Sequence, residues 1–303
     1  MSTSTQVSAR RPRRAAHDGS PQERPNWVLT VAALVIVAYF LFPLWWLVVA
    51  STKSNSGLFT SSGLWFANHF NFFQNLRTVF TYDHGVFLLW LRNTVMYAVV
   101  ASAGSALLST AAGYSLAKLR YRGREVIFSV ILGAIMVPMT ALAIPTYLLF
   151  AKLGLVNTPW AVIIPSLVSP FGVYLMRVYA ADAIDRSLLE SARVDGAGEA
   201  AIFFRIALRL LAPGFVTVLL FQLVATWNNY FLPLIMLSNQ TWYPLTVGLA
   251  QWQATGASGG SGSQVLFSIV ITGSLVSILP LMVAFLVLQR YWQSGLAAGS
   301  VKQ

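Results

Sequence analysis

The side chains able to do polar chemistry are concentrated between Asp182 and Glu199, within an otherwise apolar chain. Five of the nine acidic residues lie there, with arginines among them, whereas the three histidines lie elsewhere. The sequence has no cysteine, no HExxH metal motif and no Gly-Lys-Ser/Thr phosphate loop. No apolar run supplies a histidine base for a serine nucleophile, so the pattern argues against an intramembrane enzyme. The acidic residues are Asp182, Asp185, Glu190, Asp195 and Glu199.

The stretch Ser187–Gly214, SLLESARVDGAGEAAIFFRIALRLLAPG, predicts two short helices. Ser187 and Glu190 have the spacing of a capping box, in which each side chain accepts a bond from a free backbone N–H at a helix start. Gly196 suits the left-handed turn that ends such a helix. A second helix is expected to begin near Glu199 and to approach the next apolar run at Pro213.

This polar insert has two interpretations. It is either a pair of interfacial helices resting on lipid head groups, or a docking surface for another protein. The acids are poorly placed against an anionic inner leaflet. A short capped helix with a glycine turn therefore favours docking.

The surrounding composition is that of a membrane protein. Hydrophobic residues make up 56% of the chain, charged residues 10%, and the mean hydropathy is +0.66. Six mostly apolar runs are long enough to cross a bilayer, which takes about 20 residues. These predicted spans are Trp27–Ala50, Asn93–Ala117, Val126–Phe150, Trp160–Met176, Ala212–Leu237 and Val265–Leu288.

None of the six runs contains Asp, Glu, Lys, Arg or His. Ion-driven carriers place ionisable groups inside the membrane, where their cost marks them as functional. If this chain moves a solute uphill, the energy must come from a partner. A simple pore lined by Asn, Thr and Ser remains possible.

Charge asymmetry predicts the topology. With the N-terminus inside, sixteen of the twenty Lys and Arg residues lie in cytoplasmic segments, which is the positive-inside pattern. It accounts for the formal charge of +11 without nucleic acid, and it makes both termini cytoplasmic. The four basic residues expected outside are Lys53, Arg77, Arg92 and Lys152.

Five segments follow from these patterns. Residues 1–25 are expected to be a disordered basic tail. Residues 26–50 form the first transmembrane helix, and 51–92 an external loop with a short amphipathic element. The main transmembrane domain spans 91–291 and includes a cytoplasmic loop at 181–213. Residues 292–303 form a C-terminal tail.

Several of these residues resemble a known family. Glu190-Ser191-Ala192 followed by Gly196, Ile206 and Leu208 resembles the EAA motif of permease subunits of bacterial ABC importers. Ile184-Asp185 and Asp195-Gly196-Ala197 resemble the carbohydrate, maltose-type branch. WNNYFLPL at Trp227–Leu234 and the ending QRYWQSGLAAGSVK at Gln289–Lys302 also resemble that branch. The likeness extends from about Leu91 to the C-terminus.

The resemblance implies a fold and an assembly. The fold is all-α, with six transmembrane helices in a type I ABC importer permease and a coupling helix in the cytoplasmic loop. The partners are a second permease subunit, two ATPase subunits and an extracytoplasmic sugar-binding protein, in the bilayer of a bacterial inner membrane. ATP and Mg²⁺ would bind the ATPases, with no cofactor on this chain, which would form half of the path for a di- or oligosaccharide.

The resemblance also assigns roles to residues. The ATPase would be contacted by Glu190, Ser191, Ala192, Asp195, Gly196 and Ala197, and again by the tail at Gly295, Leu296, Gly299, Val301 and Lys302. Two residues depart from the motif. Arg209 stands where proline is usual, so the second loop helix is expected to run on to Pro213, and Ser191 replaces an alanine.

A candidate substrate path lies in the fifth run. Trp227, Asn228, Asn229 and Tyr230 combine stacking surface with hydrogen-bonding groups, which suits a sugar. The alternative is that these groups pack and bond between helices, as polar side chains in membrane helices commonly do. For the chain as a whole, the alternative to an importer is a pore or scaffold whose polar loop docks some other protein.

Overall fold

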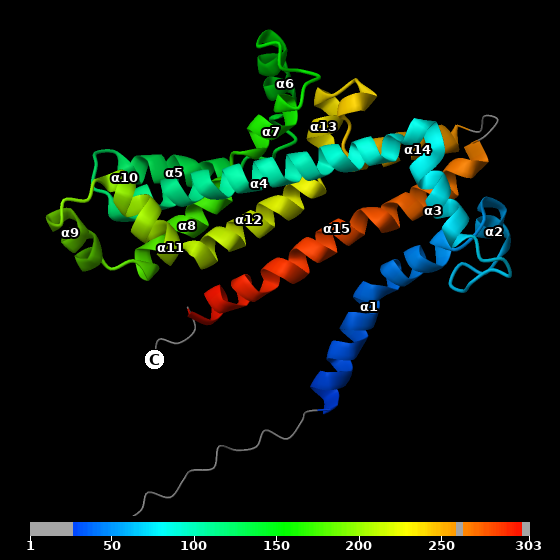
Figure 1. Cartoon of the computed structure of the whole chain (residues 1–303), viewed down its shortest axis with the longest axis horizontal. Helices are drawn as coiled ribbons and strands as arrows, with labels where there is room; N and C mark the ends of the chain where they lie inside the picture. The colour runs from blue at the N-terminus through cyan, green and yellow to red at the C-terminus, as the bar shows by residue number, and fades with distance from the viewer. Residues whose placement is uncertain (1–26, 259–262, 299–303) are drawn as a thin grey trace, which may run out of the picture. The chain divides into compact units, whose positions relative to one another are not determined.

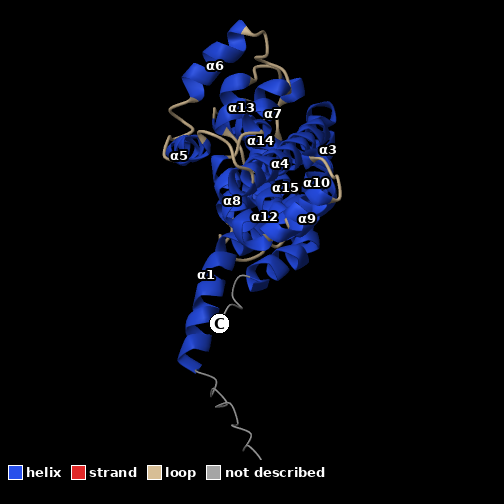
Figure 2. Cartoon of the chain, turned by 90° about the vertical axis from the view of Figure 1, so that its left-hand side faces the viewer, coloured by secondary structure: helices blue, strands red, loops and turns tan. Residues whose placement is uncertain are grey.

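The computed structural model of the protein describes residues 27–258 and 263–298, and every element within these ranges is helical (Figures 1 and 2). The chain divides into two compact units, residues 1–45 and 46–303. Helix α1 begins in the first unit and ends in the second. The bounds of the helices outside the polar loop are α1 Trp27–Ser51, α2 Asn55–Thr60, α3 Phe72–Thr81, η1 Tyr82–Gly85, α4 Val86–Lys118, α5 Arg124–Ile135, α6 Ala143–Lys152, α7 Trp160–Ser166, α8 Pro170–Ala183, α12 Ala212–Trp227, α13 Phe231–Met236, η3 Gln240–Trp242, α14 Leu245–Ala257 and α15 Ser263–Ala298.

The described part of the first unit is the α1 segment from Trp27 to Trp45. Its large apolar side chains are exposed all around the helix. A helix that is apolar on every face is suited to a bilayer rather than to water. The predicted first span is therefore confirmed as a helix of spanning length.

The second unit is built on α4, which packs against both α8 and α12, while α12 also packs against α15. Glycines let the backbones approach closely. A Cβ at Gly113 would lie 2.7 Å from the backbone N of Arg177, and one at Gly172 would lie 2.7 Å from Ser109 Oγ. Small residues at such crossings are typical of membrane helix packing, where close van der Waals contact replaces the hydrophobic effect.

Four helices of the described chain are long and apolar enough to cross a membrane, or five when one sharply bent pair is counted as a span. The predicted run Val126–Phe150 is not one helix but is divided into α5 and α6. The break contains Pro138, which lacks a backbone N–H and disfavours helical geometry in the residue before it. The fifth predicted span is likewise interrupted, because α12 ends at Trp227 and α13 begins at Phe231.

The segment predicted as an external loop is largely helical. Its α3 is the expected amphipathic element, with Asn75 and Val79 buried. Asn75 Nδ2 donates to the carbonyl oxygens of Ser51 at 2.9 Å and Lys53 at 2.8 Å, which ties α3 to the end of α1. Lys53 is itself buried and donates from Nζ to the carbonyl of Ser62. The segment is thus a packed part of the unit.

Candidate functional site

The polar loop, residues 184–211, connects α8 to α12 and contains α9 (Arg186–Val194) and a second helical segment, Glu199–Leu210. It emerges where α4 and α8 end together. Lys118, the last residue of α4, donates from Nζ to the carbonyl oxygens of Ala181 at 3.0 Å and Ile184 at 2.5 Å. This ammonium satisfies carbonyls that the end of α8 leaves without helical partners.

Helix α9 begins two residues earlier than a capping box with Ser187 as N-cap requires, so that prediction is wrong. The N-cap is Asp185, whose extended backbone (φ −74°, ψ 140°) lets its carboxylate accept from the Ser187 N–H at 3.0 Å. The backbone N–H of Ser187 lowers the pKa of Asp185. Aspartate is as good an N-cap as serine, so the backbone path out of α8 decided between them.

Helix α9 ends in a Schellman motif at Gly196. The N–H of Gly196 donates to the Arg193 carbonyl at 3.0 Å, and the N–H of Ala197 donates to the Ala192 carbonyl at 3.0 Å. Gly196 has φ +81°, the left-handed conformation that the motif requires at this position. The predicted glycine turn is confirmed. A Cβ at Gly196 would have no heavy atom within 4 Å, so the turn stands clear of the rest of the chain.

The inner face of α9 is part of the hydrophobic core. Leu189, 1% exposed, and Ala192 pack with buried residues of α4, α8 and the second loop segment. That segment contributes Ile202 and Phe203, and the Phe203 ring lies 5.5 Å from the ring of Tyr114 on α4. The apolar side that would face lipid in the interfacial interpretation is therefore occupied by the bundle.

The outer face of α9 is open. Glu190, Ser191 and Asp195 are exposed, and between them Val194 is 88% exposed. Six loop residues are expected to contact a partner. Four of them lie on the surface, namely Glu190, Ser191, Asp195 and Gly196, whereas Ala192 is buried and Ala197 is half-buried. Ala192 and Ala197 thus hold the helix to the bundle. Val194 was missed, although helical spacing from Glu190 and Ser191 places it on the same face.

An ion pair closes the glycine turn. Arg193 Nε lies 2.7 Å from Glu199 Oε1, joining α9 to the start of the second segment. The glutamate's hydrogen bond raises the pKa of Arg193. Both side chains are about half exposed, so the pair orients the two helices more than it stabilises them.

The second loop segment starts at Glu199, as predicted, but it is not a uniform α-helix. It consists of α10 (Glu199–Ile202), a π-helical turn η2 (Phe203–Ala207) and α11 (Leu208–Leu210). It ends at Leu210 and meets α12 at an angle of 79°, short of Pro213. Arg209 thus continues the helix past the position where the motif has proline, and the bend falls at Leu211.

The second candidate site, Trp227–Tyr230, lies at the break between α12 and α13 rather than inside a continuous span. Trp227 is buried, and its Nε1 donates to the Ser277 carbonyl of α15 at 3.2 Å. Asn228 is exposed and bonds within its own helix to the Val224 carbonyl at 2.9 Å. The Asn229 carbonyl accepts from Thr246 Oγ1 at 2.7 Å, and Tyr230 is exposed. Trp227 therefore makes the interhelical contact of the packing interpretation.

The predicted tail contact falls mostly outside the described residues. Gly295 and Leu296 lie in the last turns of α15, which runs to Ala298. Gly299, Val301 and Lys302 lie beyond the described chain. The role of this tail stays a prediction.

Comparison with known proteins identifies the family of this chain. Residues 109–298 match the family described as binding-protein-dependent transport system inner membrane component. The chain belongs to this family. The matched region contains the whole polar loop, so the loop belongs to the part of the chain that the family shares.

Curated relatives extend the match over nearly the whole chain. The arabinooligosaccharides transport system permease protein AraQ of Halalkalibacterium halodurans is 33% identical over 278 residues, covering 91% of this chain and 96% of the relative. The lactose transport system permease protein LacG of Rhizobium radiobacter is 30% identical, covering 91% and 94%. The chain is thus similar to ABC importer permeases along its length.

A solved structure supports the same fold. A chain of a bacterial ABC transporter involved in the import of the acidic polysaccharide alginate superposes with a TM-score of 0.76 and 25% identity. The match covers 88% of this chain and 95% of that one. The chain therefore has the permease fold of ABC importers. Its family is described as the inner membrane component of binding-protein-dependent transport systems.

Proposed function

We propose that this chain is a permease subunit of an ATP-driven carbohydrate importer. It forms half of the translocation path together with a second, homologous permease subunit. Two cytoplasmic ATPase subunits supply the energy through the polar loop, and an extracytoplasmic binding protein delivers the sugar. Six spans with both termini in the cytoplasm are part of this proposal.

The observation that carries the proposal is the two-sided character of α9. Its inner face is fixed in the core through Leu189 and Ala192, while its outer face projects the exposed Val194 among polar residues. Motion transmitted between a soluble ATPase and membrane helices needs such a rigid link, because a loose loop would absorb the displacement. The Schellman turn and the Arg193–Glu199 pair supply that rigidity.

The substrate class rests on the relatives. The names of the two curated relatives specify arabinooligosaccharides and lactose, and the solved transporter imports a polysaccharide. All three ligands are sugars of two or more residues. A di- or oligosaccharide is therefore the substrate that we propose for this chain.

Site-specific crosslinking of the full chain tests the coupling. The chain has no cysteine, so Val194→Cys introduces a single thiol on the outer face of α9. We expect a thiol crosslinker to join it to a co-expressed cytoplasmic ATPase subunit, with the joined partner identified by mass spectrometry. Leu188→Cys, a partly exposed position elsewhere on α9, is the matched control and should react less.

The pore or scaffold alternative makes the opposite prediction. It expects no ATP-hydrolysing subunit to co-purify with the chain and no ATPase peptide in the crosslinked product. Either absence, with the chain correctly inserted, would exclude the coupling role that we assign to α9.

A further inference from the structure

Two adjoining cavities open beside the polar loop, at the turn between α4 and α5. The larger, of about 450 Å³, and the smaller, of about 390 Å³, are both lined by Arg120 and Arg186. Arg120 belongs to the turn and Arg186 begins α9, so residues 66 positions apart in sequence meet here. The coupling mechanism uses neither arginine.

The two shared arginines differ from their neighbours in lacking a carboxylate partner. Arg124 lies 2.9 Å from Glu125, whose other oxygen lies 2.7 Å from Arg177. Arg193 is paired with Glu199. Within the described chain, neither Arg120 nor Arg186 forms an ion pair. The acid of the larger cavity, Glu125, is therefore neutralised by Arg124 and Arg177, while Glu190 lines only the smaller cavity. The lining of the larger cavity keeps the positive charge of Arg120 and Arg186.

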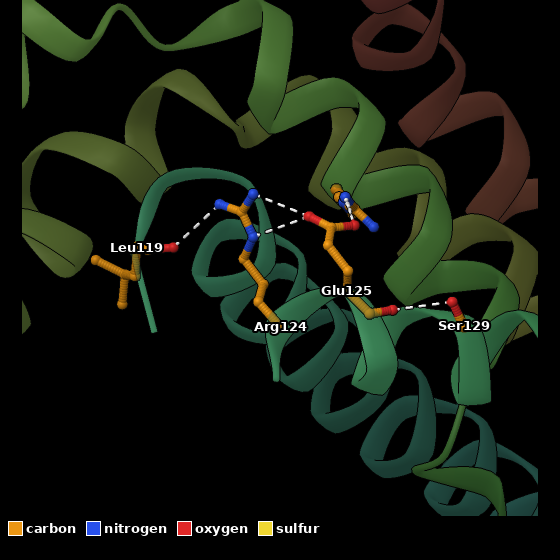
Figure 3. A network of polar contacts seen from close by, with 5 residues as sticks. Leu119, Arg124, Glu125 and Ser129 are labelled. Atoms are coloured by element: carbon orange, nitrogen blue, oxygen red, sulfur yellow. Dashed lines mark hydrogen bonds and ion pairs between the residues drawn. The ribbon is translucent and has the colours of Figure 1, made fainter. Parts of the chain in front are cut away.

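The turn that carries Arg120 is held in place. Arg124 Nη1 donates to the Leu119 carbonyl at 3.3 Å while its other nitrogens bond Glu125, as Figure 3 shows. Ser129 Oγ in turn donates to the Glu125 carbonyl at 2.9 Å. These contacts hold the two ends of the turn, so the backbone position of Arg120 is defined by the fold.

The surface beside the larger cavity is apolar. Val126 lines the cavity and is 68% exposed, and Val130, one turn further along α5, is 67% exposed. A positively charged cavity that continues into an exposed apolar helix face matches a ligand with a phosphate at one end and acyl chains at the other. Basic pockets at the ends of membrane helices are known to bind such head groups.

We propose that the larger cavity, centred on Arg120 and Arg186, binds the headgroup of an anionic phospholipid whose acyl chains lie along Val126 and Val130 of α5. A free phosphate would satisfy the arginines but would leave the apolar face unused. The site adjoins α9, so bound lipid would buttress the polar loop from the side of the bilayer. The proposal rests on the membrane location of the chain and not on its coupling to an ATPase.

Native mass spectrometry of the full-length chain tests the site, with phosphatidylglycerol as probe and phosphatidylcholine of the same acyl chains as the neutral comparison. We expect the wild type to retain phosphatidylglycerol preferentially. A basic residue near an anionic head group contributes about fivefold to affinity, so the double variant Arg120→Gln, Arg186→Gln should bind it about 30-fold more weakly. Binding of phosphatidylcholine should not change.

Arg122→Gln is the matched control, because Arg122 lies exposed on the same turn and lines neither cavity. Its phosphatidylglycerol affinity should stay within about twofold of the wild type, since only a general charge effect is removed. Thermal unfolding and gel filtration establish that all variants are folded. An equal loss in Arg122→Gln, or no loss in the double variant, overturns the site.

Competition separates lipid from soluble phosphate. Millimolar inorganic phosphate should leave phosphatidylglycerol bound, and displacement by phosphate would reject the lipid assignment. None of these measurements involves uptake or ATPase association. A failure of the lipid site is therefore distinguishable from a failure of the coupling proposal.

Discussion

Gly196→Val is the substitution that most directly probes the coupling proposal. Gly196 has φ +81°, and a residue with a Cβ pays about 1–2 kcal/mol to adopt a left-handed backbone, with β-branched residues at the upper end. No heavy atom lies within 4 Å of the position of a Cβ, so valine adds no clash inside the chain itself. The intrinsic cost is therefore about 2 kcal/mol, which the packed α9 should survive without loss of membrane insertion.

The docking surface changes this estimate. If Gly196 fits closely against an ATPase subunit, the valine side chain overpacks that contact, at a further cost of about 1–3 kcal/mol. Together with the weakened turn, this should reduce ATP-driven uptake by roughly tenfold or more, since 1.4 kcal/mol is a factor of ten. Gly196→Ala has a similar backbone cost and little bulk, so its loss of uptake should be smaller.

Two glycines separate backbone strain from bulk. Gly154 has φ +67° and open space around it, so Gly154→Val reproduces the strain away from the polar loop. Gly198 also has open space but φ −72°, so Gly198→Val adds bulk within the loop without the strain. Uptake is measured in membranes with matched permease levels. Near-normal uptake by Gly196→Val, or an equal loss in Gly154→Val, would refute the docking argument.

Three further outcomes are expected. With an impermeant thiol reagent on sealed cells, a cysteine replacing Ser62 should be labelled and one replacing Gly198 should not; labelling of the latter would overturn the N-inside topology. Arg177 and Arg124 lower the pKa of Glu125, so their pairing stabilises the fold above the ordinary carboxyl pKa of about 4.5 and is lost as the pH falls through the lowered value. The melting temperature of the wild type should therefore fall more between pH 6 and pH 3 than that of Glu125→Gln. Parallel curves of melting temperature against pH would contradict the pairing. Trp227→Phe removes the bond to α15 and should cost roughly 1–3 kcal/mol of stability while leaving the uptake KM unchanged, whereas a raised KM at normal stability would return Trp227 to the substrate path.

Several features of this protein follow from the sequence because their causes are local. Hydropathy over about 20 residues predicts a membrane helix without knowledge of its neighbours, and α1, α4 and α15 agree with the predicted runs. The turn at Gly196 follows from the unique freedom of glycine at positive φ. The spacing from Glu190 to Leu208 predicted the family, since a motif records residue types and intervals only.

Other features depend on where the chain runs in space. Ser187 and Asp185 are equally good caps, and the buried, extended Ile184 that leaves α8 decided for Asp185. Hydropathy could not reveal the break at Pro138, since apolar residues continue through it and proline in a membrane helix can either kink or end it. Trp227 became a packing residue only when α15 brought the Ser277 carbonyl within reach of its indole.

The polar loop combines features that the sequence determines with features that only the tertiary structure determines. Its composition predicted a helical insert with charged residues, but composition does not say which face of α9 is covered. The bundle buries Leu189 and Ala192, and this leaves Val194 outside. The cavity between Arg120 and Arg186 likewise exists only because α9 folds back beside the turn after α4. Burial and charge proximity are properties of pairs of distant segments, so only the tertiary structure can set them.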